Sequence, residues 1–316
     1  MNYKKANWAF FGMVLLHFIA VFVLSAVSGV YVPGIAGNII LSELMLVIPA
    51  AAALFFSKEK WKNVLSLHRM KFSSVLMVLL YTILLMPLTT LLNAISMLFV
   101  DNAVGAISTE MMELPFLFSF FLVAIWGPVC EEFVFRGVIY RGQLRSGNTI
   151  GAILLSSLLF GLIHMNFNQA PYAFVLGIAM ALVMEVTGTL LAPILVHVIF
   201  NGQSVIQMYA MEFLAPGMLE EQLQMEIGMD EMAITISVYV VLSLICTALA
   251  ACVLVWLSKN EKRDDYLLWL FGQRRNRKLM RNNGMLESDA VGKLWSIPAA
   301  VGMVACLVYM LWTVAQ

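Results

Sequence analysis

Hydrophobic residues along this chain form long uninterrupted blocks, without the alternation with polar residues that amphipathic helices or strands show. About 20 helical residues are needed to cross the hydrocarbon core of a bilayer, and each block is close to that length. The blocks span residues 8–28, 38–57, 72–99, 115–135, 149–166, 171–187, 189–209, 233–257 and 295–315. We therefore predict an all-α polytopic membrane protein with about nine (eight to nine) transmembrane helices and a cavity within the helix bundle.

Composition supports this class and excludes others. The chain is 61% hydrophobic and only 12% charged, whereas soluble domains carry about 25% charged residues. The formal net charge is zero, so we expect no nucleic-acid partner. The 4 cysteines form no CxxC pair, which argues against a disulfide framework and against a zinc knuckle.

The distribution of charge predicts the orientation in the membrane. If the N-terminus is cytoplasmic and the blocks alternate, all 19 Lys and Arg residues fall on the inner side, as cytoplasmic loops favour. The C-terminus is then outside, and we expect the plasma membrane as the location. We divide the chain into two N-terminal helices (1–71), a core (72–210) and a C-terminal part (211–316), which contains an acidic outer loop, the eighth helix, a basic cytoplasmic loop and the last helix.

Ionisable residues inside the blocks are costly and mark candidate functional sites. Glu43 and Glu185 lie near block ends, where we expect both to reach an interface by bending outward. His17 lies in the middle of the first block, and we expect it to be a hydrogen-bonded packing histidine.

Three polar motifs interrupt the fourth, fifth and seventh blocks. They read "EEFVFR" (Glu131 to Arg136), "FGLIH" (Phe160 to His164) and "HVIFN" (His197 to Asn201). Residues four apart share a helix face, so Glu132 faces Arg136, while Glu131 points about 100° away. His197 and Asn201 share one face by the same rule, and Gly161 leaves room for a neighbouring helix beside His164.

Glu131, His164, His197 and Asn201 would suit a hydrolase if they converge. A carboxylate with a histidine can deprotonate water, and an amide with a second histidine can stabilise an oxyanion. The alternative is that these polar groups only hold helices together. The predicted depths of these residues in the membrane differ, which makes convergence difficult. Glu131 and His197 lie near the predicted inner face, whereas His164 lies about 20 Å along its block. Convergence requires a tilted or deeper fifth helix, around a cavity open to the cytoplasm.

The three motifs resemble those of the CAAX protease and bacteriocin-processing family (CPBP, or Abi), which includes the Rce1-type CAAX prenyl proteases. The family pattern is EExxxR, FxxxH and HxxxN, and the resemblance covers roughly residues 75–210. It implies intramembrane proteolysis, an EC 3.4 hydrolase activity. It also implies Glu131 as general base assisted by His164, an oxyanion hole of His197 and Asn201, and orienting roles for Glu132, Arg136 and Phe160.

Cofactor and partners stay open at this point. The family has been described as metal-dependent, and the zinc alternative would use Glu131, His164 and His197 as ligands. HExxH is absent and a glutamate-activated water needs no metal, so we expect no cofactor. The expected partners are a membrane-associated peptide or protein substrate and the lipid bilayer. A non-enzymatic membrane regulator or immunity protein is the alternative, and a transporter fits less well because the polar residues gather at one place.

Overall fold

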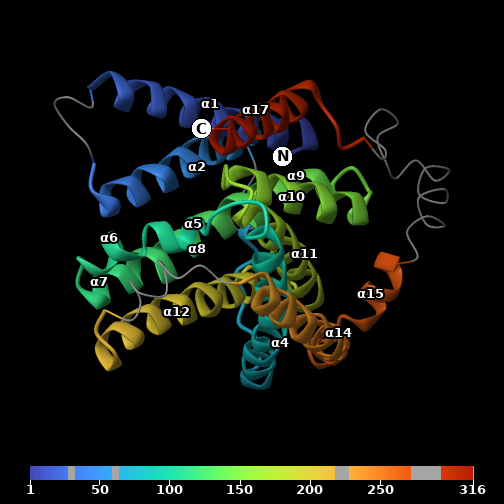
Figure 1. Cartoon of the computed structure of the whole chain (residues 1–316). Coiled ribbons are helices and arrows are strands. Elements are labelled where there is room, and N and C mark those ends of the chain that lie inside the picture. Colours follow the sequence, from blue (N-terminus) through green and yellow to red (C-terminus); the bar gives the residue numbers. More distant parts are fainter. Residues whose placement is uncertain (28–32, 59–63, 218–227, 272–292, 316) are drawn as a thin grey trace.

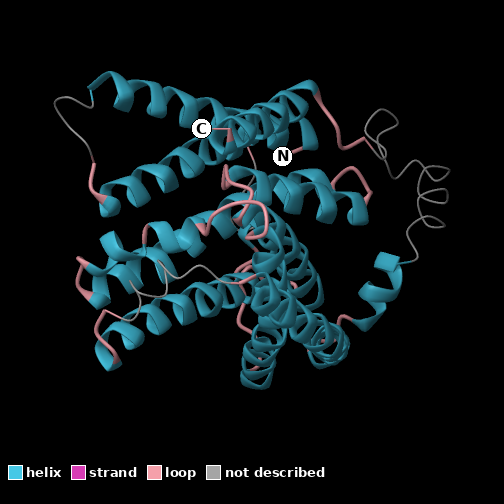
Figure 2. Cartoon of the chain, viewed as in Figure 1, coloured by secondary structure: helices cyan, strands magenta, loops and turns pink. Residues whose placement is uncertain are grey.

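The computed structural model is a bundle of helices (Figures 1 and 2). It describes residues 1–27, 33–58, 64–217, 228–271 and 293–315, and within these ranges it contains helices and loops but no strand. Residues 218–227 of the expected acidic outer loop and 272–292 of the expected basic loop lie outside the described residues.

The helices follow the hydrophobic blocks closely. Their bounds are α1 Tyr3–Val27, α2 Ile35–Ser57, α4 Phe72–Ser96, α5 Ala103–Ala106, α6 Ser108–Met112, α7 Phe116–Phe120, η1 Phe121–Trp126, α8 Gly127–Glu132, η2 Phe133–Tyr140, α9 Arg141–Leu144, α10 Thr149–Ile163, α11 Gln169–Thr187, α12 Leu191–Leu214, α14 Met229–Asn260, α15 Asp264–Phe271 and α17 Ile297–Val314. The labels η1 and η2 mark two π-helical segments.

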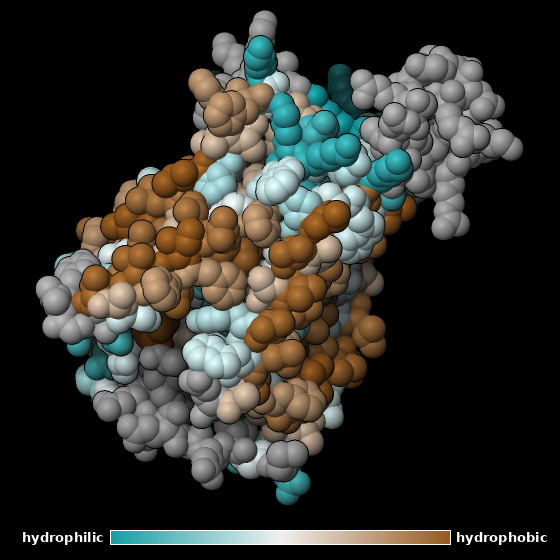
Figure 3. Space-filling model, turned by 90° about the horizontal axis from the view of Figure 1, so that it is seen from above, coloured by the Kyte–Doolittle hydropathy of each residue, from teal (hydrophilic) through white to brown (hydrophobic). Residues whose placement is uncertain are grey.

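Eight helices among the described residues are long and apolar enough to cross a membrane. The fifth predicted block, 149–166, corresponds to α10, an apolar helix of 15 residues that is shorter than these eight. The chain is therefore an all-α, multi-pass integral membrane protein. Figure 3 shows hydrophobic side chains over much of one face, and large apolar residues such as Phe22, Phe55 and Leu244 are more than 70% exposed, as expected for a surface that contacts lipid.

One helix boundary differs from its prediction. The block at 115–135 was expected to end before Arg136, but the helical backbone continues from Phe116 to Leu144 as one span of 29 residues. Arg136 is therefore inside the bundle, 2% exposed, and does not lie in a cytoplasmic loop. Its charge does not end the span because a partner within the bundle neutralises it.

Two glycines allow α10 and α11 to pack closely against each other. A Cβ on Gly161 would lie 2.7 Å from the Ala170 carbonyl oxygen, and one on Gly177 would lie 2.9 Å from the Ser157 Cβ. Both contacts are too short for any larger residue, so α10 and α11 approach each other closely only because glycine occupies these positions. The role predicted for Gly161 is confirmed. α1 packs against both α2 and α17 (Figure 1).

Candidate active site

Glu131 and Glu132 lie near the middle of the Phe116–Leu144 helix and point into different environments. The Glu132 side chain is fully buried, while that of Glu131 is 15% exposed. Neighbouring residues on a helix project about 100° apart, so the two glutamates lie on different faces of the helix. The π-helical segments η1 and η2 flank the pair on either side, and such segments often occur at functional sites.

Glu132 is the centre of a buried ion pair. Arg136 Nη1 donates to Glu132 Oε1 at 2.9 Å, and Arg136 Nη2 donates to the Gly177 carbonyl oxygen at 3.2 Å. The guanidinium also lies 4.4 Å from the centre of the Phe160 ring. The pairing of Glu132 with Arg136 is confirmed, but the pair lies deep in the bundle, not where the span meets water. Removing either partner would leave a buried charge uncompensated, which is far more costly than lacking both.

His197 connects the two glutamates. Its Nδ1 lies 2.9 Å from Glu132 Oε1, and its Nε2 lies 3.9 Å from Glu131 Oε2. A carboxylate can only accept a hydrogen bond, so Nδ1 carries a proton and donates to Glu132. This bond fixes the ring so that Nε2 faces Glu131, in the way that a carboxylate orients a functional histidine.

His164 follows the last residue of α10 and is oriented by its own helix. Its Nδ1 lies 2.8 Å from the Phe160 carbonyl oxygen, which can only accept. Nδ1 therefore carries the proton, and in the neutral ring Nε2 holds a lone pair. The Phe160 ring meets both His164 and His197 edge-on, at centroid distances of 5.1 and 5.8 Å. Phe160 thus packs between the two histidines and beneath Arg136.

Asn201 lies one turn after His197 on α12. Its Nδ2 donates to the Val123 carbonyl oxygen at 3.0 Å, which lies in the π-helical segment η1. An amide nitrogen carries two hydrogens, so one remains for another acceptor. The contact with Val123 holds the amide group at a fixed position relative to the helix that carries Glu131.

The four predicted residues line one cavity. A hollow of about 290 Å³ is bordered by Glu131, His164, His197 and Asn201, together with Phe160 and apolar residues of α11 and α12. The expected conflict of depth does not arise, because Glu131 is in the middle of a 29-residue span and not at its inner end. His164 meets it from the end of the short helix α10.

The geometry gives no support to a zinc centre. Among the described residues, no three His, Cys, Asp or Glu side chains are grouped so that they could hold a metal ion. We therefore derive no chemical step through a metal.

The outward bending expected for Glu43 and Glu185 is wrong. Glu185 is 1% exposed and accepts hydrogen bonds from the hydroxyls of Tyr140, at 2.8 Å, and Tyr266. Burial raises the pKa of Tyr266 above its ordinary value, and the charge of Glu185 raises it further. Arg263 Nε also donates to the Glu185 carbonyl oxygen at 2.8 Å. These partners come from distant parts of the sequence, which is why the local pattern did not indicate them.

Glu43 and His17 are also placed differently from expectation. Glu43 is 6% exposed and borders the same cavity as Glu131. His17 has ring contacts with Phe18 and Tyr309, but its Nε2 is buried and has no hydrogen-bond partner among the described residues. Their ionisable character within a span was the one sequence signal that could have assigned them to the site.

Comparison with known proteins finds a family model that matches the region of the candidate active site. Residues 113–203 match the family described as type II CAAX prenyl endopeptidase Rce1-like. This range contains all three polar motifs. The helices α1, α2, α4, α14 and α17 lie outside it. The family resemblance stated from the motifs is confirmed.

Two curated relatives match part of the chain. The membrane-embedded CAAX protease MroQ of Staphylococcus aureus (strain USA300) is 41% identical over 93 residues, which are 27% of this chain and 37% of that protein. YdiL of Bacillus subtilis (strain 168), named as a membrane peptidase, is 30% identical over 78 residues, 25% of this chain and 32% of its own. The chain thus matches about a third of the length of these relatives. No solved structure matches it.

Proposed function

Residues 113–203 carry an Rce1-like CAAX protease domain, and from the cavity in this domain we propose that the chain is an intramembrane endopeptidase of the glutamic type. One observation carries the proposal. Glu131 of α8, His164 at the end of α10, and His197 and Asn201 of α12 all border the same 290 Å³ cavity. Polar groups that only held helices together would be expected to bond each other, whereas Glu131 Oε2 is buried without a hydrogen-bond partner among the described residues.

The first step is the activation of water. Glu131 accepts a proton from a water molecule in the cavity, while the lone pair of His164 Nε2 accepts a hydrogen bond from the same water and orients it. The oxygen of that water bonds to the carbonyl carbon of the substrate, and the carbonyl oxygen becomes an oxyanion. Positioned proton transfer of this kind contributes roughly 10²–10⁴-fold to a rate.

The oxyanion requires hydrogen-bond donors in the same cavity. Asn201 supplies its remaining amide hydrogen. His197 supplies Nε2–H when its ring is protonated on both nitrogens. When the C–N bond breaks, Glu131 returns its proton to the leaving nitrogen. The products are a carboxylic acid and an amine, and the enzyme regains its starting state.

The substrate class is a peptide or protein tail associated with the membrane, since the cavity lies within a bundle of membrane-spanning helices. The test is cleavage of a membrane-peptide library by the purified protein in lipid nanodiscs, with products identified by mass spectrometry. Cleavage that depends on Glu131 supports the proposal. Absence of cleavage, together with full cellular function of Glu131→Gln, would indicate a non-enzymatic regulator or immunity protein.

The same assay decides between the glutamic and zinc-dependent mechanisms. We expect the rate to be unchanged after incubation with a zinc chelator, because glutamate and histidine activate the water without a metal. Loss of the rate that stoichiometric zinc restores would establish the zinc-dependent alternative. Zinc content of the purified protein, measured by elemental analysis, provides an independent readout.

A further inference from the structure

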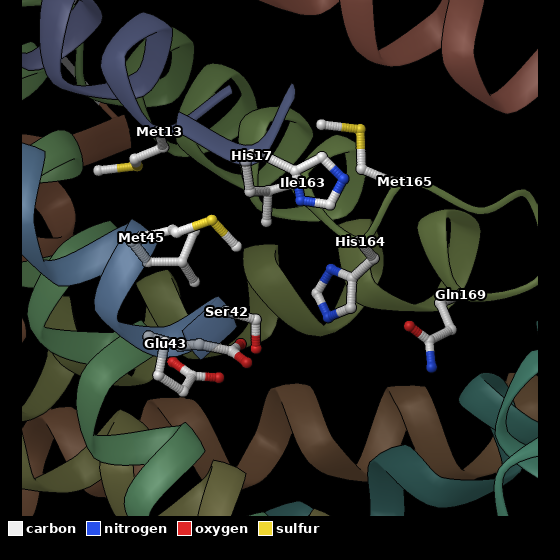
Figure 4. A pocket seen from close by; sticks show the side chains of 11 residues that line it. Met13, His17, Ser42, Glu43, Met45, Ile163, His164, Met165 and Gln169 are labelled. Atoms are coloured by element: carbon white, nitrogen blue, oxygen red, sulfur yellow. The ribbon is translucent and has the colours of Figure 1, made fainter. Parts of the chain in front are cut away.

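The cavity has a second lobe, and most of its lining lies outside the three motifs. This hollow of about 230 Å³ shares the residues Ser42, Glu43, Glu131, His164 and Gln169 with the 290 Å³ cavity, so the two adjoin. The rest of its lining is His17 and the apolar side chains of Met13, Met45, Leu46, Ile163 and Met165. Figure 4 shows the His17 and His164 imidazoles directed into it. We call it the N-terminal lobe, because much of its lining comes from α1 and α2.

Glu43 of the N-terminal lobe lies beside the helix that carries Glu131. Gly127 lies four residues before Glu131 and therefore on the same helix face. A Cβ at residue 127 would lie 3.5 Å from Glu43 Oε1 and from the Leu122 carbonyl oxygen. Both are ordinary van der Waals distances, so the Glu43 carboxyl group lies directly beside the helix that carries Glu131.

Besides Glu131 Oε2, two polar atoms of the N-terminal lobe have no hydrogen-bond partner among the described residues. Glu43 is 6% exposed, and its Oε2 makes no hydrogen bond among the described residues; the same holds for His17 Nε2. Each unpartnered buried polar atom costs roughly 1–3 kcal/mol, and an ionisable residue inside a span marks a functional site by default. A ligand with hydrogen-bonding groups would remove this cost.

The remaining lining describes the other part of such a ligand. Three methionines, a leucine and an isoleucine surround the two polar atoms, and methionine side chains adapt to varied apolar shapes. Pockets that bind ligands are mainly apolar with a few placed polar groups. A peptide segment combines both features, because an apolar side chain is attached to backbone amide groups that need partners.

We propose that the N-terminal lobe is a substrate subsite, which binds an apolar side chain of the peptide next to the scissile bond. In it, Glu43 and His17 hydrogen-bond the backbone amides of the peptide. The inference rests on the proposed function, since the scissile bond is the one attacked beside Glu131. It assigns substrate selection to α1 and α2, which lie outside the matched residues 113–203.

The test changes the size of the lobe and reads the cleavage preference. In nanodiscs, Met45→Trp is expected to shift the preferred residue at one substrate position from large to small apolar side chains. Met45→Ala is expected to shift it the other way. The matched control is Leu44→Trp, since Leu44 is the next residue on α2 and is 41% exposed; its preference should be unchanged. Identical preferences in all three folded variants would overturn the subsite.

The polar atoms are tested by separating binding from turnover. Glu43→Leu is expected to raise KM roughly tenfold, as loss of one buried hydrogen bond predicts, while kcat stays within about twofold because the bond forms in ground and transition states alike. Glu43→Gln retains hydrogen-bonding groups and should change KM less. A lower kcat with unchanged KM in Glu43→Leu would show that Glu43 acts in the chemistry, and would refute its assignment to the subsite.

Binding by a non-cleaving protein distinguishes failure of this inference from failure of the proposed function. The Met45 variants are combined with Glu131→Gln, and binding of the same peptide library is measured in nanodiscs. One outcome is that the unmodified protein cleaves no peptide, while Met45→Trp still weakens the binding of peptides with large apolar residues. This outcome would refute proteolysis and support the subsite. If cleavage occurs and neither preference nor binding responds to Met45, the subsite alone is refuted.

Discussion

Glu131 and Glu132 are neighbours on one helix, yet their carboxyl groups have opposite surroundings. Glu132 is fully buried and its Oε1 accepts hydrogen bonds from both Arg136 and His197, which leaves its Oε2 without one in the described part of the chain. Glu131 borders a cavity, and its Oε2 has no hydrogen-bond partner among the described residues. The difference arises from helix geometry, because adjacent residues project about 100° apart. Glu132 is bonded to side chains of the protein, and Glu131 is left available to a substrate or a water molecule.

A second pair of glutamates repeats the contrast on other helices. Glu185 is bonded to the hydroxyls of Tyr140 and Tyr266, while Glu43 has a buried oxygen without a partner beside the cavity. In both pairs the carboxylate that accepts hydrogen bonds from side chains is expected to stabilise the fold, and the other carboxylate to serve the site. Mutations can test this division, because the two roles affect different measurements.

Glu131→Gln should have the largest effect on activity. We expect turnover to fall roughly 10²–10⁴-fold, the usual contribution of a general base, with an unchanged melting temperature. Peptide cleavage and thermal unfolding in detergent are the two measurements. A destabilised Glu131→Gln together with a stable but inactive Glu132→Gln would mean that the two roles are reversed.

Glu132→Gln should lower stability as well as activity. It leaves Arg136 buried without its carboxylate, and breaking such a pair costs about 3–5 kcal/mol. It also removes the acceptor that orients His197. Arg136→Gln should behave similarly, and the double variant should be less destabilised than the sum of the two, since both remove the same pair. Additive losses in unfolding experiments would show that the ion pair is not the source of stability.

Asn201→Ala should reduce turnover with little change in substrate binding. Loss of one oxyanion donor typically costs on the order of 10²–10³ in rate, and the unbonded Val123 carbonyl should lower stability by about 1 kcal/mol. The matched control is Ser204→Ala, because Ser204 lies on the same helix, borders the cavity and bonds only the Phe200 carbonyl. Weaker binding at an unchanged rate would make Asn201 a substrate contact.

Tyr266→Phe should have the smallest effect, confined to stability. Removing its bond to Glu185 is expected to cost about 1–2 kcal/mol, because Tyr140 still donates to that carboxylate, and cleavage should be unaffected. The pKa of Tyr266 is raised in the folded protein. Its contribution is therefore fully present below the unfolded pKa of about 10 and is lost as pH rises towards the folded value. The loss of melting temperature should thus be constant between about pH 6 and 9, and a loss of activity would place Tyr266 in the catalytic machinery.

The sequence alone determined most of the helices and the principal candidate site. The block predicted at 72–99 became α4, Phe72–Ser96, and the block at 189–209 became α12, Leu191–Leu214. The pairing of Glu132 with Arg136 followed from their spacing of four. These features depend on neighbours in the chain, where hydrophobicity and helical periodicity are sufficient to decide.

Only the tertiary structure decided how the charged residues inside the bundle are partnered. The helix predicted at 115–135 ended too early, because hydropathy treats each charged residue separately. In the structure Arg136 is neutralised by Glu132 and bonded to Gly177 of another helix. The positions of Glu43 beside Glu131 and of Glu185 beside Tyr266 join residues far apart in sequence. Whether a buried ionisable group is satisfied or left available to a ligand depends on such distant contacts, because the cost of burial is set by the partners that the fold supplies.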